Sequence, residues 1–147
     1  MPTLMRKINI LSRAEGVYRT DNLTTNDLNA CHHSYILAIS NNPGMTQDEL
    51  AKHLCVNKSG VTRHLSHLES YGYVTRVPSE KDRRSMLVYP TDKMLNILPQ
   101  VKAIIHDWDS LISNSLTVKE TKLLHGLLDK ITQEAEKYMS NREENCR

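Results

Sequence analysis

The spacing of hydrophobic residues along the chain predicts a mainly helical protein. Residues 4–18 place apolar side chains at steps of three and four, which is the spacing of one face of a helix. A second helix is predicted for residues 27–40, because the polar stretch 21–27 ends in helix-starting residues and Pro43 and Gly44 interrupt the chain afterwards.

The next segment has the pattern of two short helices joined by a tight turn. Thr46 and Glu49 have the T-x-x-E spacing of a capping box, in which each side chain bonds a free backbone N–H of the first turn. Asn57 is a suitable N-cap for the second short helix, which is expected to end near Gly72. The apolar side of that helix consists of Val61, Leu65 and Leu68. These dimensions predict a helix-turn-helix.

Two β-rich runs follow, at residues 73–77 and 86–89, and they predict a hairpin. The stretch between them, SEKDRRSM, places Lys81, Arg83 and Arg84 at the tip. A capped helix, a tight turn, a second helix and a hairpin with a basic tip, in this order, indicate a winged helix-turn-helix. The fold class is therefore predicted to be mainly α with a small β-hairpin wing.

The helices outside this segment carry more apolar surface than a small domain needs. A long helix is predicted after Thr91, and a last helix opens with a second capping box from Thr117 to Glu120. The long helix is apolar over more than one face, so it must be buried on more than one side. We therefore predict that the N-terminal helix and the last two helices form a dimer interface, since a two-fold dimer is the commonest closed assembly.

Composition argues against several classes of protein. The first twenty residues are interrupted by charges, and no run of apolar residues is long enough to span a bilayer. Three cysteines without a repeating spacing are not a disulfide framework and are typical of a cytoplasmic protein with reduced thiols. There is no nucleophile elbow, glycine-rich phosphate loop or paired metal motif. We therefore expect neither an enzyme nor a bound cofactor.

The distribution of charge is more informative than the net charge of +2. Residues 55–68 contain two cations and two histidines but no acidic residue. The outward face of the helix that starts after Asn57 is predicted to carry Lys58, Ser59, Thr62, Arg63, Ser66 and His67. Such side chains read base edges and hold phosphates in the major groove, and Gly60 among them would let DNA come close. A solvated polar face on a helical protein-interaction module is the alternative.

Residues 44–93, GMTQDELAKHLCVNKSGVTRHLSHLESYGYVTRVPSEKDRRSMLVYPTDK, resemble the DNA-binding core of the MarR family of bacterial transcriptional regulators. The specific part is the D-x-R wing after an N-K-S-x-V-T-R-x-L helix. The resemblance implies a winged helix-turn-helix at residues 27–90, dimerisation helices at 1–26 and 91–140, and a polar tail at 141–147. The chain departs from the family where Cys55 and Met94 replace customary glycines.

The resemblance also implies roles for individual residues. Arg84 would enter the minor groove, where a narrow groove attracts a guanidinium, and Asp82 would orient the wing arginine through a charged hydrogen bond. The remaining positions that it assigns to DNA contacts are Thr46, Gln47, Asn57, Lys58, Ser59, Thr62, Arg63, His67 and Arg83.

The function implied by the resemblance is a homodimeric repressor that binds a pseudo-palindromic operator and responds to a ligand. Such regulators commonly bind small aromatic or phenolic effectors, and the candidate lining residues here are His33, Tyr35 and Trp108. A redox- or metal-sensing regulator of the same fold is the alternative.

That alternative would depend on the cysteines and histidines. For redox sensing, Cys55 lies near two lysines, Cys31 is expected to be a small buried residue, and Cys146 lies in the tail. Metal binding is not expected, because His32 and His33 directly follow Cys31, and adjacent positions splay around a helix.

Overall fold

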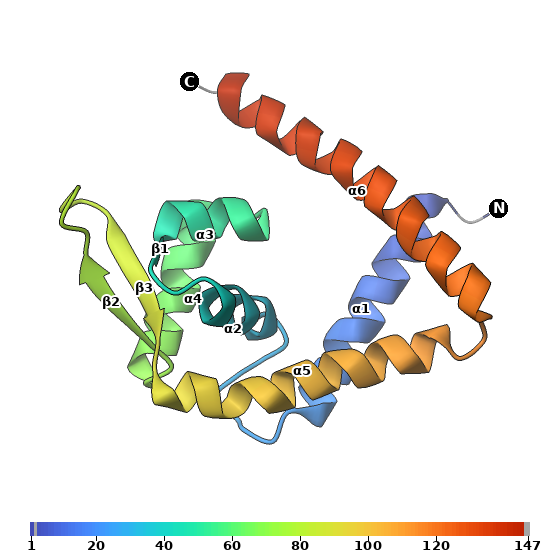
Figure 1. Ribbon diagram of the computed structural model, residues 1–147, viewed down its shortest axis with the longest axis horizontal. Helices are drawn as coiled ribbons and strands as arrows, with labels where there is room; N and C mark the ends of the chain where they lie inside the picture. The colour runs from blue at the N-terminus through green and yellow to red at the C-terminus, as the bar shows by residue number, and fades with distance from the viewer. Residues whose placement is uncertain (2, 146–147) are drawn as a thin grey trace. The chain divides into compact units, whose positions relative to one another are not determined.

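The computed structural model describes residue 1 and residues 3–145, the side chains of 143–145 excepted, and divides into two compact units, Met1–Trp108 and Asp109–Arg147. In chain order (Figure 1) the elements are α1 (Leu4–Asn22), α2 (His32–Asn41), β1 (Met45–Thr46), α3 (Gln47–Leu54), α4 (Lys58–Ser70), β2 (Val74–Pro78), β3 (Met86–Pro90), α5 (Asp92–Ser113) and α6 (Val118–Asn145). In the described part of the chain, every helix is either too short or too polar to cross a bilayer.

The predicted helix caps are present. Thr46 and Glu49 form a complete capping box at the start of α3, and the Asn57 side chain accepts the N–H of Gly60 at the start of α4. The second box is also formed, since Glu120 accepts the backbone N–H of Thr117 while the Thr117 hydroxyl accepts that of Glu120. These caps are local in sequence, which is why the pattern alone predicts them.

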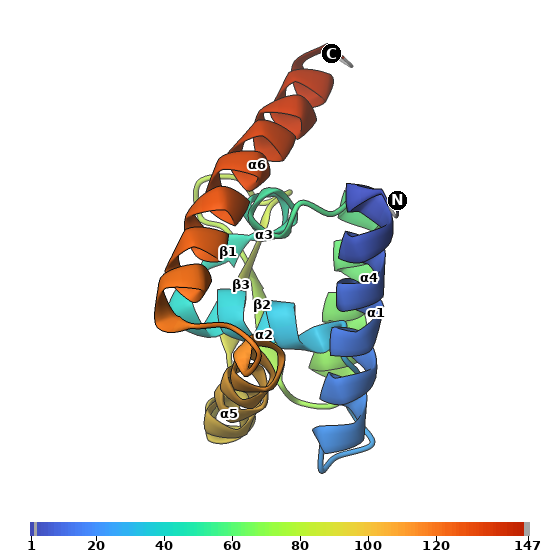
Figure 2. The same ribbon diagram turned by 90° about the vertical axis from the view of Figure 1, so that its right-hand side faces the viewer.

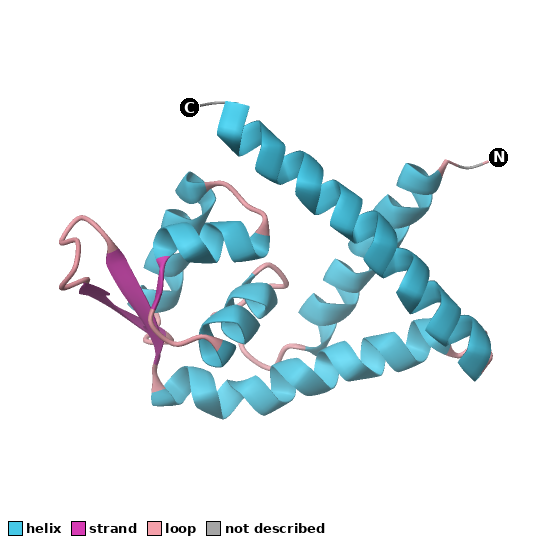
Figure 3. Cartoon of the chain, turned by 45° about the horizontal axis from the view of Figure 1, so that its top comes forward, coloured by secondary structure: helices cyan, strands magenta, loops and turns pink. Residues whose placement is uncertain are grey.

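A three-stranded antiparallel sheet has the order β1-β3-β2. The β2–β3 hairpin confirms the predicted wing, and its loop projects beyond the strands (Figure 3). Strand β1 was not predicted, because two residues are too few to show the alternation of a strand. It pairs Met45 with Val88 and Thr46 with Leu87, which fixes the start of α3 to the base of the wing.

Helix α2 lies between α1 and the sheet in two perpendicular views (Figures 1 and 2). The prediction that it begins at Asp27 was wrong, since it begins at His32. Asn29 competes with the helix: its side chain accepts the N–H of Cys31, and its own N–H donates to the ring of His32. Residues 27–31 are therefore a turn, although Leu28 within it reaches the core.

One core serves the helix-turn-helix and the sheet. Its buried residues come from α2, α3, α4, the strands and the start of α5, and those at 0% exposure include Ile36, Ile39, Leu50, Val61, Leu65, Leu68, Val88, Met94 and Val101. Helix α1 has no buried residue, and it extends four residues beyond the predicted end to Asn22.

The turn between α3 and α4 uses a left-handed backbone at Cys55, with φ 54° and ψ 39°. Among the described residues it is the one non-glycine residue with positive φ. This conformation suits glycine, because a Cβ approaches the following carbonyl oxygen there. The departure from the family pattern at Cys55 therefore stores strain in the turn that sets the angle between α3 and α4.

We predict that Cys55→Gly raises the free energy of unfolding by about 1 kcal/mol, because it removes the left-handed penalty. Urea denaturation measures this change. Cys55→Ala is the matched control, since it removes the thiol but keeps the Cβ, and it should bring no gain. Equal stabilities of the two variants would contradict the assignment of strain to the backbone.

Candidate nucleic-acid interface

Helix α4 has one buried side and one bare polar face. Val61, Leu65 and Leu68 are fully buried, as predicted. The face turned to solvent carries Lys58, Ser59, Thr62, Arg63 and Ser66. The Lys58 ammonium lies 2.9 Å from the Asp48 carboxylate, but both groups are well exposed. An exposed pair of this kind is weak, so Lys58 can exchange Asp48 for a phosphate at little cost.

The start of α4 explains why position 60 is glycine. The backbone N–H of Gly60 donates to the Asn57 side-chain oxygen at 2.8 Å, and Ser59 donates to the same oxygen at 3.1 Å. A Cβ on Gly60 would lie 2.9 Å from that oxygen. The glycine therefore keeps room for the cap, which is a local reason in addition to the predicted close approach of DNA.

Arg76 on β2 joins the wing to both helices of the helix-turn-helix. Its Nε lies 3.0 Å from a Glu69 carboxylate oxygen, and its other nitrogens reach Gln47 at 3.3 Å and Ser66 at 3.4 Å. Gln47 also lies 3.4 Å from the Thr62 hydroxyl. Because the Arg76 side chain is only 18% exposed, it acts as a half-buried connector between β2, α3 and α4.

Sequence reasoning missed this role of Arg76. No helical or strand spacing links position 76 to Glu69 or Gln47, so the network becomes visible only when the three elements are packed. The one available signal was a lone charged residue inside an otherwise uncharged strand.

The tip of the wing is ordered by its own backbone. The N–H of Ser79 donates to the Ser85 carbonyl at 2.8 Å, and the N–H of Ser85 donates to the Asp82 carbonyl at 2.9 Å. The Asp82 carboxylate accepts the backbone N–H of Arg84 at 3.0 Å. Asp82 thus does make a charged hydrogen bond to Arg84, but through the backbone, which leaves the exposed guanidinium available.

Residues 28–86 match the model of the MarR family. The chain is 23% identical over 137 residues to the uncharacterized HTH-type transcriptional regulator YybA of Bacillus subtilis (strain 168), which covers 93% of this chain and 91% of the relative. It is 28% identical over 105 residues to the HTH-type transcriptional regulator BilQ of Clostridium symbiosum, covering 71% of this chain and 73% of BilQ.

A solved structure of a MarR mutant from E. coli complexed with operator DNA is 29% identical, with a TM-score of 0.80 over 87% of this chain and 92% of the other. Over residues 28–86 this chain is similar to the MarR family. It is a DNA-binding transcriptional regulator with a winged helix-turn-helix.

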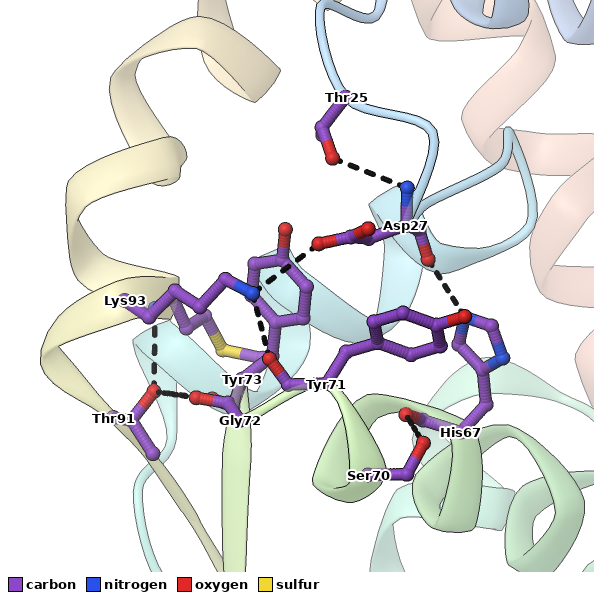
Figure 4. Close-up of polar contacts among 10 residues, drawn as sticks. Thr25, Asp27, His67, Ser70, Tyr71, Gly72, Tyr73, Thr91 and Lys93 are labelled. Atoms are coloured by element: carbon purple, nitrogen blue, oxygen red, sulfur yellow. Dashed lines mark hydrogen bonds and ion pairs between the residues drawn. The ribbon is translucent and has the colours of Figure 1, made fainter.

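His67 does not lie on the DNA-facing side that was predicted for it. Its Nε2 is 2.6 Å from the backbone oxygen of Asp27, and Figure 4 shows the ring turned toward the loop before α2. The ring also stacks on His32, with centroids 4.7 Å apart. The reason is helical phase: position 67 lies next to the buried Leu68 and beyond the arc that holds Thr62, Arg63 and Ser66.

The loop before α2 also connects α5 to the helix-turn-helix. Lys93 donates to the Asp27 carboxylate at 3.2 Å and to the Tyr71 carbonyl at 2.7 Å, and its ammonium lies 4.3 Å from the centre of the Tyr73 ring (Figure 4). Lys93 ends the stretch Thr91-Asp92-Lys93, which follows the wing and begins α5. Here it closes the base of the wing against the turn before α2.

The three predicted effector-lining residues lie in two different surroundings. His33 and Tyr35 are buried at 0% and 4% exposure within the core around α2. Trp108 instead packs on Tyr18 of α1, with centroids 5.4 Å apart. The groove beside it is lined by Ile10, Arg13, Ala14, Val17, Tyr18, Asp21 and Trp108, and contains neither of the other two residues.

The cysteines differ from expectation at one position. Cys31 is exposed, so the prediction that it is buried was wrong; it lies in the turn before α2 rather than within the helix. Cys55 is also exposed, and Cys146 lies outside the described residues. Within the part of the chain that the structure describes, no three His, Cys, Asp or Glu side chains gather as metal ligands.

Two buried histidines of α2 are held in the neutral form. Burial lowers the pKa of His32 from 6.5 to about 4, helped by the neighbouring rings of His67, His64 and His33. Burial likewise lowers the pKa of His33 to about 4, and the Arg19 guanidinium contributes. Neither ring nitrogen of His33 has a hydrogen-bond partner among the described residues. The native core therefore disfavours protonation at both positions.

We predict that acid destabilises the fold between pH 6.5 and about 4 through His32 and His33. In that window the unfolded chain binds protons that the native state does not, so the free energy of unfolding falls as pH falls, by up to about 1.4 kcal/mol per pH unit for each histidine. Urea denaturation at a series of pH values measures the slope.

His33→Leu should make that slope shallower, because leucine binds no proton in either state. His106→Gln is the matched control, since His106 is exposed on α5. A slope unchanged by His33→Leu would contradict the prediction.

Proposed function

We propose that this regulator is a homodimeric repressor that binds a pseudo-palindromic operator and is released by a small effector. The observation that carries the proposal is the juxtaposition of a bare polar face on α4 with an exposed guanidinium at the wing tip. A helix of this size fits the major groove, and the wing reaches the neighbouring minor groove. A relative from E. coli has been solved in complex with operator DNA, which supports DNA as the partner.

Each proposed contact uses a charged or hydrogen-bonding group of the side chain that is available to DNA. Lys58 and Arg63 supply cations for phosphates, and Ser59 and Thr62 supply small hydroxyls at the same face. Asn57 uses its oxygen as the helix cap, which leaves its amide N–H groups for DNA. Thr46 and Gln47 at the start of α3 are proposed to contact the phosphate backbone, and Arg83 and Arg84 to contact the minor groove.

The dimer is supported by apolar side chains that the chain leaves exposed. On α1 the exposed residues include Leu4, Met5, Ile8, Ile10, Leu11 and Val17. On α6 they include Leu123, Leu124, Leu127, Leu128 and Ile131, which recur at helical spacing. Contiguous apolar surfaces of this kind mark an interface. In a two-fold dimer the two α4 helices would read half-sites about 34 Å apart.

The experiment that tests the function is selection of bound sequences from a random duplex library. An enriched inverted repeat is expected, because a two-fold dimer presents the same reading surface twice. Repression and effector release then follow from transcription assays on the recovered operator with small aromatic and phenolic compounds. Recovery of no common sequence would overturn the proposal, and catalytic turnover by the purified protein would favour an enzyme instead.

We predict that Arg84→Ala weakens operator binding by roughly 1–3 kcal/mol and lowers the salt dependence of binding, because one minor-groove cation is lost. Fluorescence anisotropy across a range of salt concentrations measures both. Arg142→Ala, at an exposed arginine of α6, is the matched control and should bind as the wild type does. Unchanged affinity of Arg84→Ala would remove the wing from the mechanism.

We predict that Leu124→Glu weakens the dimer by at least tenfold, since roughly 1.4 kcal/mol is lost when a charge enters an apolar interface. Analytical ultracentrifugation measures the dissociation constant. Gln133→Glu adds the same charge on the opposite face of α6 and should leave the dimer intact. If both variants dimerise like the wild type, α6 is not part of the interface.

A further inference from the structure

Three histidines meet where α4 rests on the start of α2. His64 Nδ1 lies 3.4 Å from His32 Nε2, and these two rings are in edge-to-face contact with centroids 5.3 Å apart. His67 also stacks on His32. Its Nε2 bonds the Asp27 carbonyl (Figure 4). His32 is 2% exposed, so this is a buried connection behind the reading face of α4.

The hydrogen bonds determine which nitrogens carry protons. The backbone N–H of Asn29 donates to His32 Nδ1 at 3.1 Å, so that nitrogen is an acceptor. A neutral His32 therefore carries its proton on Nε2 and donates it to His64 Nδ1. The chain of donors runs from Asn29 through His32 to His64, and it is complete only when both rings are neutral.

Protonation of either ring breaks this chain. A proton on His32 Nδ1 would face the N–H of Asn29, and a proton on His64 Nδ1 would face the N–H of His32. In each case two N–H donors face each other. The buried hydrogen bond is lost, and both N–H groups are left without an acceptor. His67 behaves differently, because its Nε2–H can donate to the Asp27 carbonyl whether the ring is neutral or charged.

Among the described residues, the groups that act on His32 and His64 include no acid that would favour a charged ring. The groups that act on His32 are His33 of its own helix and His64 and His67 of α4, while Arg63 and His67 act on His64. Tyr35 of α2 lies against His64, and Tyr71 lies against His67. The Asp27 carboxylate is engaged by Lys93 of α5. Burial lowers the pKa of His64, and Arg63 and His67 contribute. Burial also lowers the pKa of His32 to about 4, and His67, His64 and His33 contribute.

We propose that His32 and His64 form a proton-sensitive junction that positions α4, and that protonation of this junction displaces α4 and weakens operator binding. The inference rests on the proposed function, since it assumes that α4 reads the operator. His32 and His64 are positioning residues here, because they act through the placement of Thr62 and Arg63. The linkage is reciprocal. If the operator binds only when α4 is packed against α2, operator binding also disfavours protonation of His32 and His64.

The sign of the pH effect separates this proposal from simple attraction to phosphates. Protonated histidines near DNA would raise affinity as pH falls, whereas a released helix lowers it. The displaced state returns both rings to water and to a pKa near 6.5, so acidification favours that state by up to about tenfold per pH unit for each linked proton.

The test is operator affinity between pH 7.5 and pH 5.5, measured by fluorescence anisotropy on the selected duplex at constant ionic strength. Circular dichroism at each pH keeps the comparison to folded protein. We expect the wild type to lose more affinity across this range than His64→Gln, whose side chain does not titrate. His106→Gln is the matched control and should keep the wild-type pH profile.

Parallel pH profiles of the wild type and His64→Gln would overturn the proposal, as would affinity that rises on acidification. An equal loss of affinity at every pH in His64→Gln would mean a purely structural role and would also overturn it. If His64→Gln does not fold, NMR titration of the imidazoles in the wild type still tests the proposal. There, titration of His32 or His64 at or above 6.5 would contradict the proposal.

Failure of the proposed function gives a different result. A wild type that binds no selected duplex even at pH 7.5 would reject α4 as a reading helix. The NMR titration and amide hydrogen exchange of α4 would still report on the junction, because acid release of α4 should accelerate exchange along that helix whether or not DNA is bound.

Discussion

The arrangement depends on the burial of one side of α4 while the opposite side stays bare. Val61, Leu65 and Leu68 are fully buried against α2, α3 and the sheet, and each contributes about 2 kcal/mol by leaving water. That contribution holds the helix against the core, so its polar side chains are not needed for packing. Thr62, Arg63 and Ser66 are therefore exposed and available for a partner.

The hydrophobic effect is not directional. It therefore fixes how closely a helix packs on the core more firmly than it fixes the rotation or tilt of the helix. Directed contacts supply the rest. Arg76 ties α4 to the wing and to α3 on one side, and the histidine pair of His32 and His64 ties it to α2 on the other. The Arg76 contacts join charged and polar side chains, whereas the proton-sensitive junction that we propose joins two imidazoles. Helix α4 is thus held on its two sides by contacts of different chemistry.

In the wing, too, one set of groups provides the structure and another set is left exposed. Its loop satisfies its own backbone through Ser79, Asp82 and Ser85, and so it needs no contact with the rest of the fold. A loop ordered in this way carries its arginines into solvent at little entropic cost, since the backbone is already fixed before any partner arrives. Its base is held by Lys93 and by the short strand β1.

The sequence by itself determined the features that depend on neighbouring residues. The capping boxes, the Asn57 cap, the apolar side of α4 and the β2–β3 hairpin all arise from spacings of a few residues, so their patterns could be read directly. The family resemblance likewise rested on a continuous segment from the helix-turn-helix to the wing.

Only the tertiary structure decided which polar side chains on α4 face outward and which face the core. His67 has a polar side chain at a helix surface, but its ring fills a site between Asp27 and His32, which are far away in the chain. Arg76 and His64 acquire their partners in the same way. A charged or polar residue can be satisfied equally well by solvent, DNA or another element, and the spacing of residues along the chain holds no information about which of these lies opposite it.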